Sequence, residues 1–319
     1  MKRVVIFLMI LLCLTSCTKK TDEISGFSMD APYRIKGENL SSESQTKVTE
    51  YLKEVDCIFN AYQSDSYLSR LNHHKKLTVS ADDAASQDLY HAVEQSLPYC
   101  NEWFDISIRP VTKLWDFKAE HPKLPDEKVL QDNLRFVDIQ NIVLEDDFIY
   151  LENNAEIELG AVAKGYVCDK ISSMLELETA LIDIGGTIKA VGKDITAGIK
   201  SPNHDGILCS FTLPAGKAVA TSGSYERYFT VNNTTYHHIL DPKTGYPMES
   251  PYASVSVICD SALKADILST TYFSQPDPEI PEEIDVIFVT KDNRIFVTDG
   301  MKDIKMLHTD YEVMNYGQE

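Results

Sequence analysis

The stretch Glu158-Leu-Gly-Ala-Val-Ala-Lys164-Gly165-Tyr166 decides the fold, because it joins a region of short strands to a helix. Before it, residues 136–159 form short β-rich runs broken by turns, and after it the spacing of apolar residues predicts a helix over residues 161–177. Small residues at such a junction let the backbone approach a ligand, and the start of a helix offers free N–H groups to a phosphate. A tight packing turn with Lys164 in solvent is the alternative interpretation.

The remaining patterns predict an α+β protein with mixed or antiparallel sheets flanked by helices. Further helices are predicted at residues 41–63, 81–103, shortly after 125, and 261–273. Strands are predicted at residues 142–144, 148–151, 157–159, 180–184, 285–290 and 294–298, with a strand-rich region between 187 and 258.

Composition limits the class of protein. The chain has 319 residues, 43% of them hydrophobic and 25% charged, which suits one large globular unit or two closely joined ones. It carries 30 Lys and Arg against 49 Asp and Glu, a net charge of −19. Because binding to nucleic acid requires cations that neutralise phosphates, nucleic acid is not expected as a partner.

The N-terminus has the pattern of an export signal. Two basic residues precede an apolar run, residues 4–14, that is too short to span a bilayer, and Leu14-Thr15-Ser16-Cys17 matches a bacterial lipobox. We expect a signal peptide over residues 1–16, a lipid on Cys17, a polar tether over 17–26, and a domain over 27–319. The product would be an exported, membrane-anchored lipoprotein outside the cytoplasm, although an ordinary secretory signal that contains a cysteine is the alternative.

Five cysteines remain beyond Cys17, and none forms a C-x-x-C pair. This argues against a cysteine zinc site or a redox pair. Two disulfides are possible, but apolar neighbours favour small core residues. The five are Cys57, Cys100, Cys168, Cys209 and Cys259.

Three more segments carry polar chemistry in the second half of the chain. Asp183-Ile-Gly185-Gly186-Thr187 fits either a ligand-binding turn or a simple hairpin, and no G-x-G-x-x-G supports a dinucleotide fold. The segment 220–228, which contains Ser222 and Gly223, can donate hydrogen bonds to phosphate or form an exposed turn. The segment 237–245 supplies His238 and Asp241, three residues apart, as candidate general bases.

Asp266 and Thr270 are four residues apart on a predicted helix, so both oxygens can face one hard cation such as Mg²⁺. The spacing alone is common and carries little weight. What is informative is the order of all these segments along one chain.

In that order the segments resemble the ApbE family, the FAD:protein FMN transferases. The resemblance extends upstream to Met29 in Phe-Ser-Met-Asp-Ala-Pro-Tyr, to Tyr62 with Ser64-Asp-Ser-Tyr-Leu-Ser-Arg-Leu-Asn72, and to Phe104-Asp105 followed by Leu114-Trp115. It covers essentially the whole chain after the signal, and it implies a single ApbE-like domain with an FAD cleft.

The resemblance also implies roles for particular residues. Flavin-side and adenine-side contacts match Met29, Tyr62, Trp103, Phe104 and Asp105; further cofactor contacts match Glu158, Lys164 and Leu240; positions near the pyrophosphate match Ser222, Gly223 and His238; and Mg²⁺ ligands match Asp266, Thr270 and the carbonyl of Ala161.

The implied reaction transfers FMN from FAD to a Thr or Ser hydroxyl of another protein through a phosphodiester, and AMP leaves. The acceptors would be extracytoplasmic redox proteins with a flavinylation motif of the D-G-x-[ST]-[GS]-A-T type. His238 is the favoured base, assisted or replaced by Asp241. An FAD pyrophosphatase that yields FMN and AMP, or a non-catalytic FAD-binding lipoprotein, are the alternatives.

Three departures from the family pattern concern the pocket. Asp30-Ala31 stands where Gly-Thr is usual, and Glu102-Trp103 stands where small residues are usual. Trp103 either stacks on a ring of the ligand or belongs to the core. Ser269 occupies a position where some members have a second acid, which predicts a more water-filled metal shell.

Overall fold

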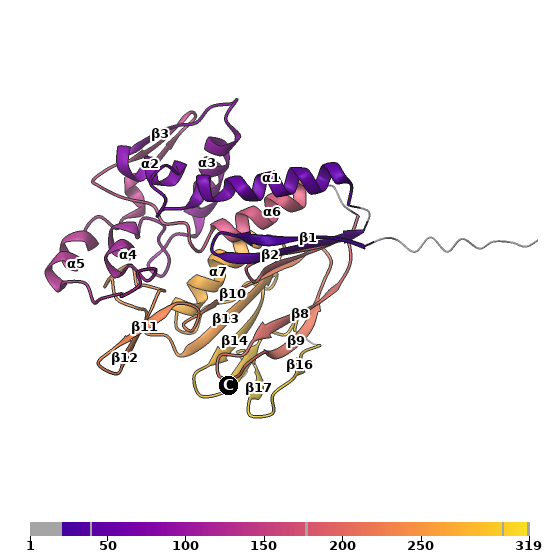
Figure 1. Ribbon diagram of the computed structural model, residues 1–319. Coiled ribbons are helices and arrows are strands. Elements are labelled where there is room, and N and C mark those ends of the chain that lie inside the picture. Colours follow the sequence, from indigo (N-terminus) through magenta and orange to yellow (C-terminus); the bar gives the residue numbers. More distant parts are fainter. Residues whose placement is uncertain (1–20, 39, 176–177, 302, 318–319) are drawn as a thin grey trace, which may run out of the picture.

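A nine-stranded sheet forms the centre of the computed structural model, which describes residues 21–38, 40–175, 178–301 and 303–317 (Figure 1). All its neighbouring strands are antiparallel except the last pair, so the expected α+β class with a mixed sheet is confirmed. In sheet order the strands are β1 (Thr21–Ser28), β2 (Ala31–Glu38), β6 (Ala180–Ile184), β7 (Thr187–Val191), β10 (Ala218–Gly223), β13 (Tyr252–Cys259), β14 (Asp285–Thr290), β15 (Arg294–Val297) and β17 (Glu312–Asn315).

Three smaller sheets surround this one. Their strands are β3 (Lys76–Thr78), β5 (Phe148–Leu151) and β4 (Ile142–Glu145) in one sheet, β16 (Lys305–Met306), β9 (Ile207–Leu213) and β8 (Ile195–Lys200) in the second, and β11 (Tyr228–Val231) with β12 (Thr234–His237) in the third.

The helices of the described chain begin mostly at residues whose side chains accept a hydrogen bond from the first turn. Ser41, Asp83 and Ser261 do this for three of them. The helices are α1 (Ser42–Phe59), α2 (Tyr67–His74), α3 (Ala84–Ser96), α4 (Arg109–Trp115), α5 (Glu127–Leu134), α6 (Ala163–Leu175) and α7 (Ala262–Ser274). Within the described ranges, none of these helices has the length and hydropathy needed to cross a membrane.

Both faces of the central sheet are covered. Every residue of β13 is buried, as expected for a strand with packing on each side. On β14 the side chains alternate: Phe288 belongs to the cluster that contains Phe273 of α7, whereas Ile287 belongs to the cluster that contains Phe211 of β9. Helices therefore cover one face of the sheet, and the β8–β9–β16 sheet covers the other.

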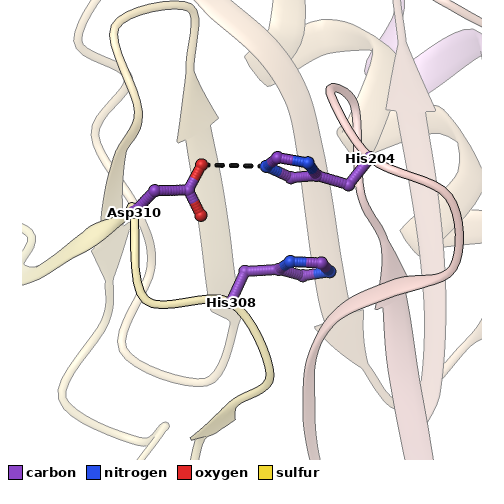
Figure 2. A group of neighbouring side chains, drawn as sticks. All are labelled: His204, His308 and Asp310. Atoms are coloured by element: carbon purple, nitrogen blue, oxygen red, sulfur yellow. Dashed lines mark hydrogen bonds and ion pairs between the residues drawn. The ribbon is translucent and has the colours of Figure 1, made fainter.

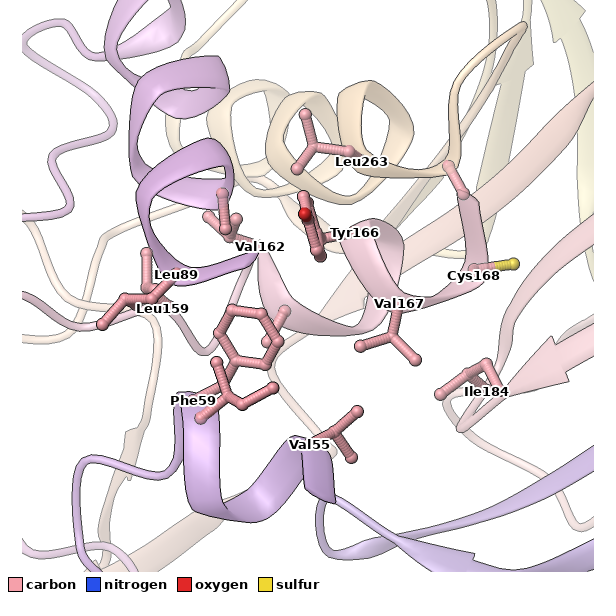
Figure 3. Packing of buried hydrophobic residues seen from close by; sticks show 14 of the residues in the cluster. Val55, Phe59, Leu89, Leu159, Val162, Tyr166, Val167, Cys168, Ile184 and Leu263 are labelled. Carbon is pink, nitrogen blue, oxygen red and sulfur yellow. The ribbon is translucent and has the colours of Figure 1, made fainter. Parts of the chain in front are cut away.

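Helices α6 and α7 pack on the sheet and against each other, and α1 lies outside α6 (Figure 1). Figure 3 shows Val55 and Phe59 of α1 directed at α6, with Tyr166 and Leu263 in the same cluster. At the crossing of α6 and α7, a Cβ added to Gly165 would lie 2.4 Å from the carbonyl oxygen of Ala262. The two helix backbones therefore approach this closely because residue 165 is glycine.

The observed boundaries correct several of the predictions. The helix expected over 41–63 ends at Phe59, and the one expected over 81–103 is confined to Ala84–Ser96 with a single 3₁₀ turn after it. Residues 157–159 are not a strand; an isolated bridge pairs Glu156 with Ile108 instead. Helices α2 and α4 were not predicted, because each spans about two turns and shows too little periodicity.

The N-terminal hairpin β1–β2 was also missed. Residues 21–26, assigned to the tether, lie in β1, which pairs along its whole length with β2. The folded unit therefore begins before residue 27. The polar composition of β1 misled the prediction, since an edge strand with exposed side chains resembles a linker. The predicted signal peptide and Cys17 lie outside the described residues.

The cysteine prediction is correct for three residues. Cys168, Cys209 and Cys259 are buried and free, whereas Cys100 is partly buried and Cys57 is exposed on α1. Apolar neighbours in the sequence did not reveal that Cys57 lies on the outer side of an amphipathic helix.

Replacing Gly165 by Ala is expected to destabilise the protein by about 1 to 3 kcal/mol, because the added methyl group collides with the backbone of α7. The matched control is Gly160→Ala, where the added Cβ meets only a side-chain oxygen of Glu158 at 3.6 Å. Urea unfolding followed by circular dichroism measures both. Equal stability of the two variants would contradict the close approach of α6 and α7.

Candidate active site

A cleft of about 780 Å³ opens between the β1–β2 turn, the start of α6, the end of β10 and the middle of α7. The predicted cofactor and metal positions, together with His238, all lie on its wall. These are Met29, Tyr62, Trp103, Phe104, Asp105, Glu158, Ala161, Lys164, Ser222, Gly223, His238, Leu240, Asp266 and Thr270. The fold therefore brings together residues that are far apart in the sequence.

Asp266 is the buried acid of the cleft, with 4% of its surface exposed. Its Oδ2 accepts a hydrogen bond of 3.0 Å from the Gly165 N–H, and Lys164 Nζ lies 3.7 Å from its Oδ1. A contact of 3.7 Å is too long for a hydrogen bond, so Oδ1 has coordination capacity left. The carboxylate is thus fixed through one oxygen and available through the other.

A group of hydroxyls lies next to Asp266 on α7 and on the facing strand β10. The Oγ of Ser222, at the end of β10, lies 2.9 Å from both Ser269 Oγ and Thr270 Oγ1. Ser269 in turn donates to the backbone carbonyl of Asp266 at 2.9 Å. Ser222 therefore belongs to a strand and its side chain faces α7, whereas the sequence left an exposed turn open as an alternative.

The donor set at this end of the cleft fits a hard cation. Asp266 and Thr270 lie one turn apart on α7 and both line the cleft, as does Ala161 in the turn just before α6. A carboxylate, a hydroxyl and a backbone carbonyl are the oxygen donors that Mg²⁺ prefers, and Mg²⁺ usually retains several waters besides its protein ligands. Ser269 is fully buried and hydrogen-bonded, and it supplies a hydroxyl rather than a second carboxylate to this end of the cleft.

His238 is held as a neutral imidazole. Its Nδ1 lies 3.2 Å from the carbonyl oxygen of Arg227, which can only accept, so Nδ1 carries the proton. Burial, reinforced by the nearby positive charge of Arg227, lowers the pKa of His238 to about 4. At neutral pH, Nε2 is therefore unprotonated and can accept a proton.

Asp241, the other candidate base, does not line the cleft. Its carboxylate accepts hydrogen bonds from the Lys243 N–H at 2.8 Å and from the Thr244 hydroxyl at 3.1 Å. These bonds shape the turn that ends at Gly245, where φ is 74°. The placement of Asp241 thus assigns it to the turn and favours His238 as the base.

Two cations that the sequence did not reveal lie close to the ring of Tyr62. The Arg109 guanidinium lies 4.1 Å from the centre of its ring, and Lys118 Nζ lies 4.3 Å from it. Arg109 also forms an ion pair of 3.0 Å with Glu158, so Tyr62 and Glu158 are held by one residue. Arg109 opens α4 and lies between the Phe104-Asp105 and Leu114-Trp115 segments that resemble the family, and this position was the one available signal.

Trp103 belongs to the cleft wall and to none of the hydrophobic clusters among the described residues, which favours the ligand-facing interpretation. Lys243 Nζ lies 5.1 Å from the centre of one of its rings. Asp105, two residues after Trp103, accepts a 2.7 Å hydrogen bond from the Ser107 N–H. Burial raises the pKa of the Asp105 carboxyl.

Asp30 is a departure from the family pattern with a structural consequence. Met29 and Asp30 form the two-residue β1–β2 turn with φ values of 52° and 57°, a conformation in which glycine is favoured. The Asp30 carboxylate pairs with Lys118 and lies 3.7 Å from Arg227. The hydrogen bond from Lys118 lowers the pKa of Asp30. Asp30 therefore tethers two cations at the wall of the cleft.

The Gly185-Gly186 pair is compatible with both a simple hairpin and a ligand-binding turn. It forms the β6–β7 turn, with φ values of 58° and 91°, and it also lines the cleft. Side chains are disfavoured at both positions by these φ values.

A large cleft that brings a neutral histidine and a buried carboxylate together with hydroxyl groups is the arrangement expected of an enzyme active site. The chain belongs to the ApbE family, whose model matches residues 29–286.

Curated relatives agree with this assignment. The chain is 30% identical over 291 residues to the FAD:protein FMN transferase of Klebsiella pneumoniae, which covers 86% of this chain and 90% of the relative. It is 27% identical to the FAD:protein FMN transferase of Treponema pallidum, covering 79% of this chain and 78% of the relative. These relatives are transferases by name.

Solved structures show the same fold. The ApbE protein of Thermotoga maritima superposes with a TM-score of 0.75 at 25% identity, covering 90% of this chain and 97% of that one. The flavin transferase ApbE of Vibrio cholerae gives a TM-score of 0.70 at 24% identity, covering 86% and 94% of the two chains.

The His238 imidazole is expected to remain neutral at pH 5.5, with the proton on Nδ1, because its pKa is about 4 against an ordinary value of about 6.5. Since the folded-state pKa is lowered, this neutral histidine stabilises the fold fully above pH 6.5, and that contribution is lost as the pH falls towards 4. Nitrogen-15 NMR of labelled histidine measures charge and tautomer. A charged ring at pH 5.5 would contradict the burial of His238.

Proposed function

We propose that this chain is a Mg²⁺-dependent FAD:protein FMN transferase that attaches FMN to a Thr or Ser hydroxyl of an acceptor protein and releases AMP. The observation that carries the proposal is the presence of a buried carboxylate, Asp266, with the Thr270 hydroxyl and the neutral His238 in one cleft. Family membership and the names of the relatives support the choice of FAD as substrate.

The cleft suits a long, anionic, aromatic ligand. Its volume of about 780 Å³ lies in the range of small-molecule sites, and Tyr62 and Trp103 offer aromatic surfaces for ring systems. A pyrophosphate would be repelled by a chain of net charge −19 unless local cations offset it. Lys164, Lys118 and Arg227 on the wall supply such cations.

Asp266, Thr270 and the carbonyl of Ala161 are the residues that would hold Mg²⁺. When bound there, the ion would act as a Lewis acid on the pyrophosphate oxygens. Lys164, whose amine is 3.7 Å from Asp266, would add a positive charge beside the same oxygens. The Gly165 N–H keeps the carboxylate oriented for this purpose.

His238 would act on the acceptor. Its Nε2 takes the proton from the Thr or Ser hydroxyl, the hydroxyl oxygen forms a bond to the phosphorus nearer the flavin, and the bond from that phosphorus to the oxygen shared with AMP breaks. The product is FMN joined to the protein by a phosphodiester. The Arg227 carbonyl stabilises the imidazolium that forms, because it accepts a hydrogen bond from Nδ1–H.

The test is incubation of the protein with FAD, Mg²⁺ and a small acceptor that carries a D-G-x-[ST]-[GS]-A-T sequence. Covalently bound flavin on the acceptor, with equal AMP, is the expected result. Free FMN and AMP with an unmodified acceptor would indicate a pyrophosphatase, and stoichiometric bound FAD without AMP would indicate a binding protein; either result contradicts the proposal.

His238→Ala is expected to lower the transfer rate by about 10²- to 10⁴-fold, the usual contribution of a general base, while FAD still binds. Asp241→Asn is the matched control, since the Asn oxygen can still accept from the Lys243 N–H and its NH2 group can donate to the Thr244 hydroxyl, so the activity should persist. Stopped assays of covalent flavin measure both. If His238→Ala keeps the transfer activity and Asp266→Ala abolishes it, His238 is not the general base.

We also propose that the protein is an exported lipoprotein anchored through Cys17, so that its acceptors lie outside the cytoplasm. The lipobox sequence supports this. Labelling of cells with a radioactive fatty acid is expected to mark the wild-type protein and not Cys17→Ser. Equal labelling of both would contradict the anchor.

A further inference from the structure

Three metal-ligating side chains meet on the surface at the β8–β9 turn. His204 comes from that turn, and His308 and Asp310 come from the segment between β16 and β17 (Figure 2). One ligand atom from each residue lies within 4.8 Å of the others. None of the three lines the cleft, so the cluster is separate from the proposed active site.

The three ligand atoms lie near the spacing of a metal site, and the stacked rings would have to tilt for both imidazole lone pairs to converge on one ion. His204 Nε2 lies 2.8 Å from Asp310 Oδ2, and the two imidazole rings stack with their centres 4.5 Å apart and an interplanar angle of 10°. Metal–ligand bonds of about 2.1 Å place neighbouring ligand atoms about 3.0 to 3.4 Å apart. The His204–Asp310 pair, at 2.8 Å, lies close to this spacing, and the exposed or half-exposed side chains can adjust their positions without unpacking the core.

The ligand chemistry selects the class of cation. Two imidazoles with one carboxylate suit Zn²⁺ and similar transition metals, whereas Mg²⁺ prefers oxygen donors alone. The strong negative charge of the whole chain further favours a cation.

We propose that His204, His308 and Asp310 bind one divalent transition-metal ion such as Zn²⁺, which joins the β8–β9 turn to the C-terminal segment. These two parts of the chain already touch. The Asn203 amide donates to the Tyr311 hydroxyl at 3.0 Å, and the Leu307 N–H donates to the Leu208 carbonyl at 2.9 Å. The ion would therefore strengthen an existing contact, and a ligand that binds only the folded state raises its melting temperature.

The experiment is calorimetric titration of the untagged, full-length protein with Zn²⁺ in excess Mg²⁺, together with thermal melting. One Zn²⁺ per chain and a higher melting temperature are expected. Loss of even an outer-shell partner usually costs roughly 10- to 100-fold in metal affinity, so His204→Ala and His308→Ala should each weaken binding by at least about tenfold. Asp310→Asn tests the carboxylate with little change of shape.

The matched control is His91→Ala, which removes an exposed histidine paired with a single carboxylate, Glu94, at 3.2 Å. It should leave the titration unchanged, as should Asp266→Asn in the cleft. Circular dichroism without zinc checks that each variant is folded. A wild-type protein that binds no Zn²⁺, or zinc binding that survives both His204→Ala and His308→Ala, would overturn the proposal.

Discussion

The hydrogen bond from the Gly165 N–H to the Asp266 carboxylate is the interaction on which the cleft depends. It links the start of α6 to the middle of α7, and it forms only because glycine lets the two backbones approach. A buried carboxylate without partners would be costly, so this bond and Lys164 stabilise a charge that α7 alone could not hold. The same crossing brings Thr270 beside Ser222 and thereby closes one end of the cleft.

The electrostatics of the molecule follow from that arrangement. The chain is strongly acidic, yet Lys118, Lys164 and Arg227 lie on the wall of one cleft. Asp30 and Asp266 hold these cations without neutralising all of them. His238 stays uncharged in this positive environment, as its proposed role of base requires. The same local positive potential would attract an anionic substrate and would keep the proposed base uncharged.

The sequence predicted those features that depend on the local pattern of residues. The α6 junction, the Asp266–Thr270 spacing and the β6–β7 turn depend on residues near one another in the chain, and they were found at their expected places. Arg109 was missed because its roles beside Tyr62 and Glu158 arise only from tertiary contacts. The β1–β2 hairpin was missed because its exposed edge has the composition of a linker. The His204–His308–Asp310 cluster was missed because His204 lies about a hundred residues before the other two.

We propose that the α6–α7 crossing forms a hard-cation site at the place where the pyrophosphate of FAD would bind. The most direct measurement is a crystal structure with FAD in which Mn²⁺ replaces Mg²⁺, so that anomalous scattering locates the ion. We expect an anomalous peak in contact with the Asp266 carboxylate, Thr270 Oγ1 and the carbonyl of Ala161, with pyrophosphate oxygens as further ligands. A bound FAD whose pyrophosphate lies away from Asp266, or an ion held by other residues of the cleft, would contradict it.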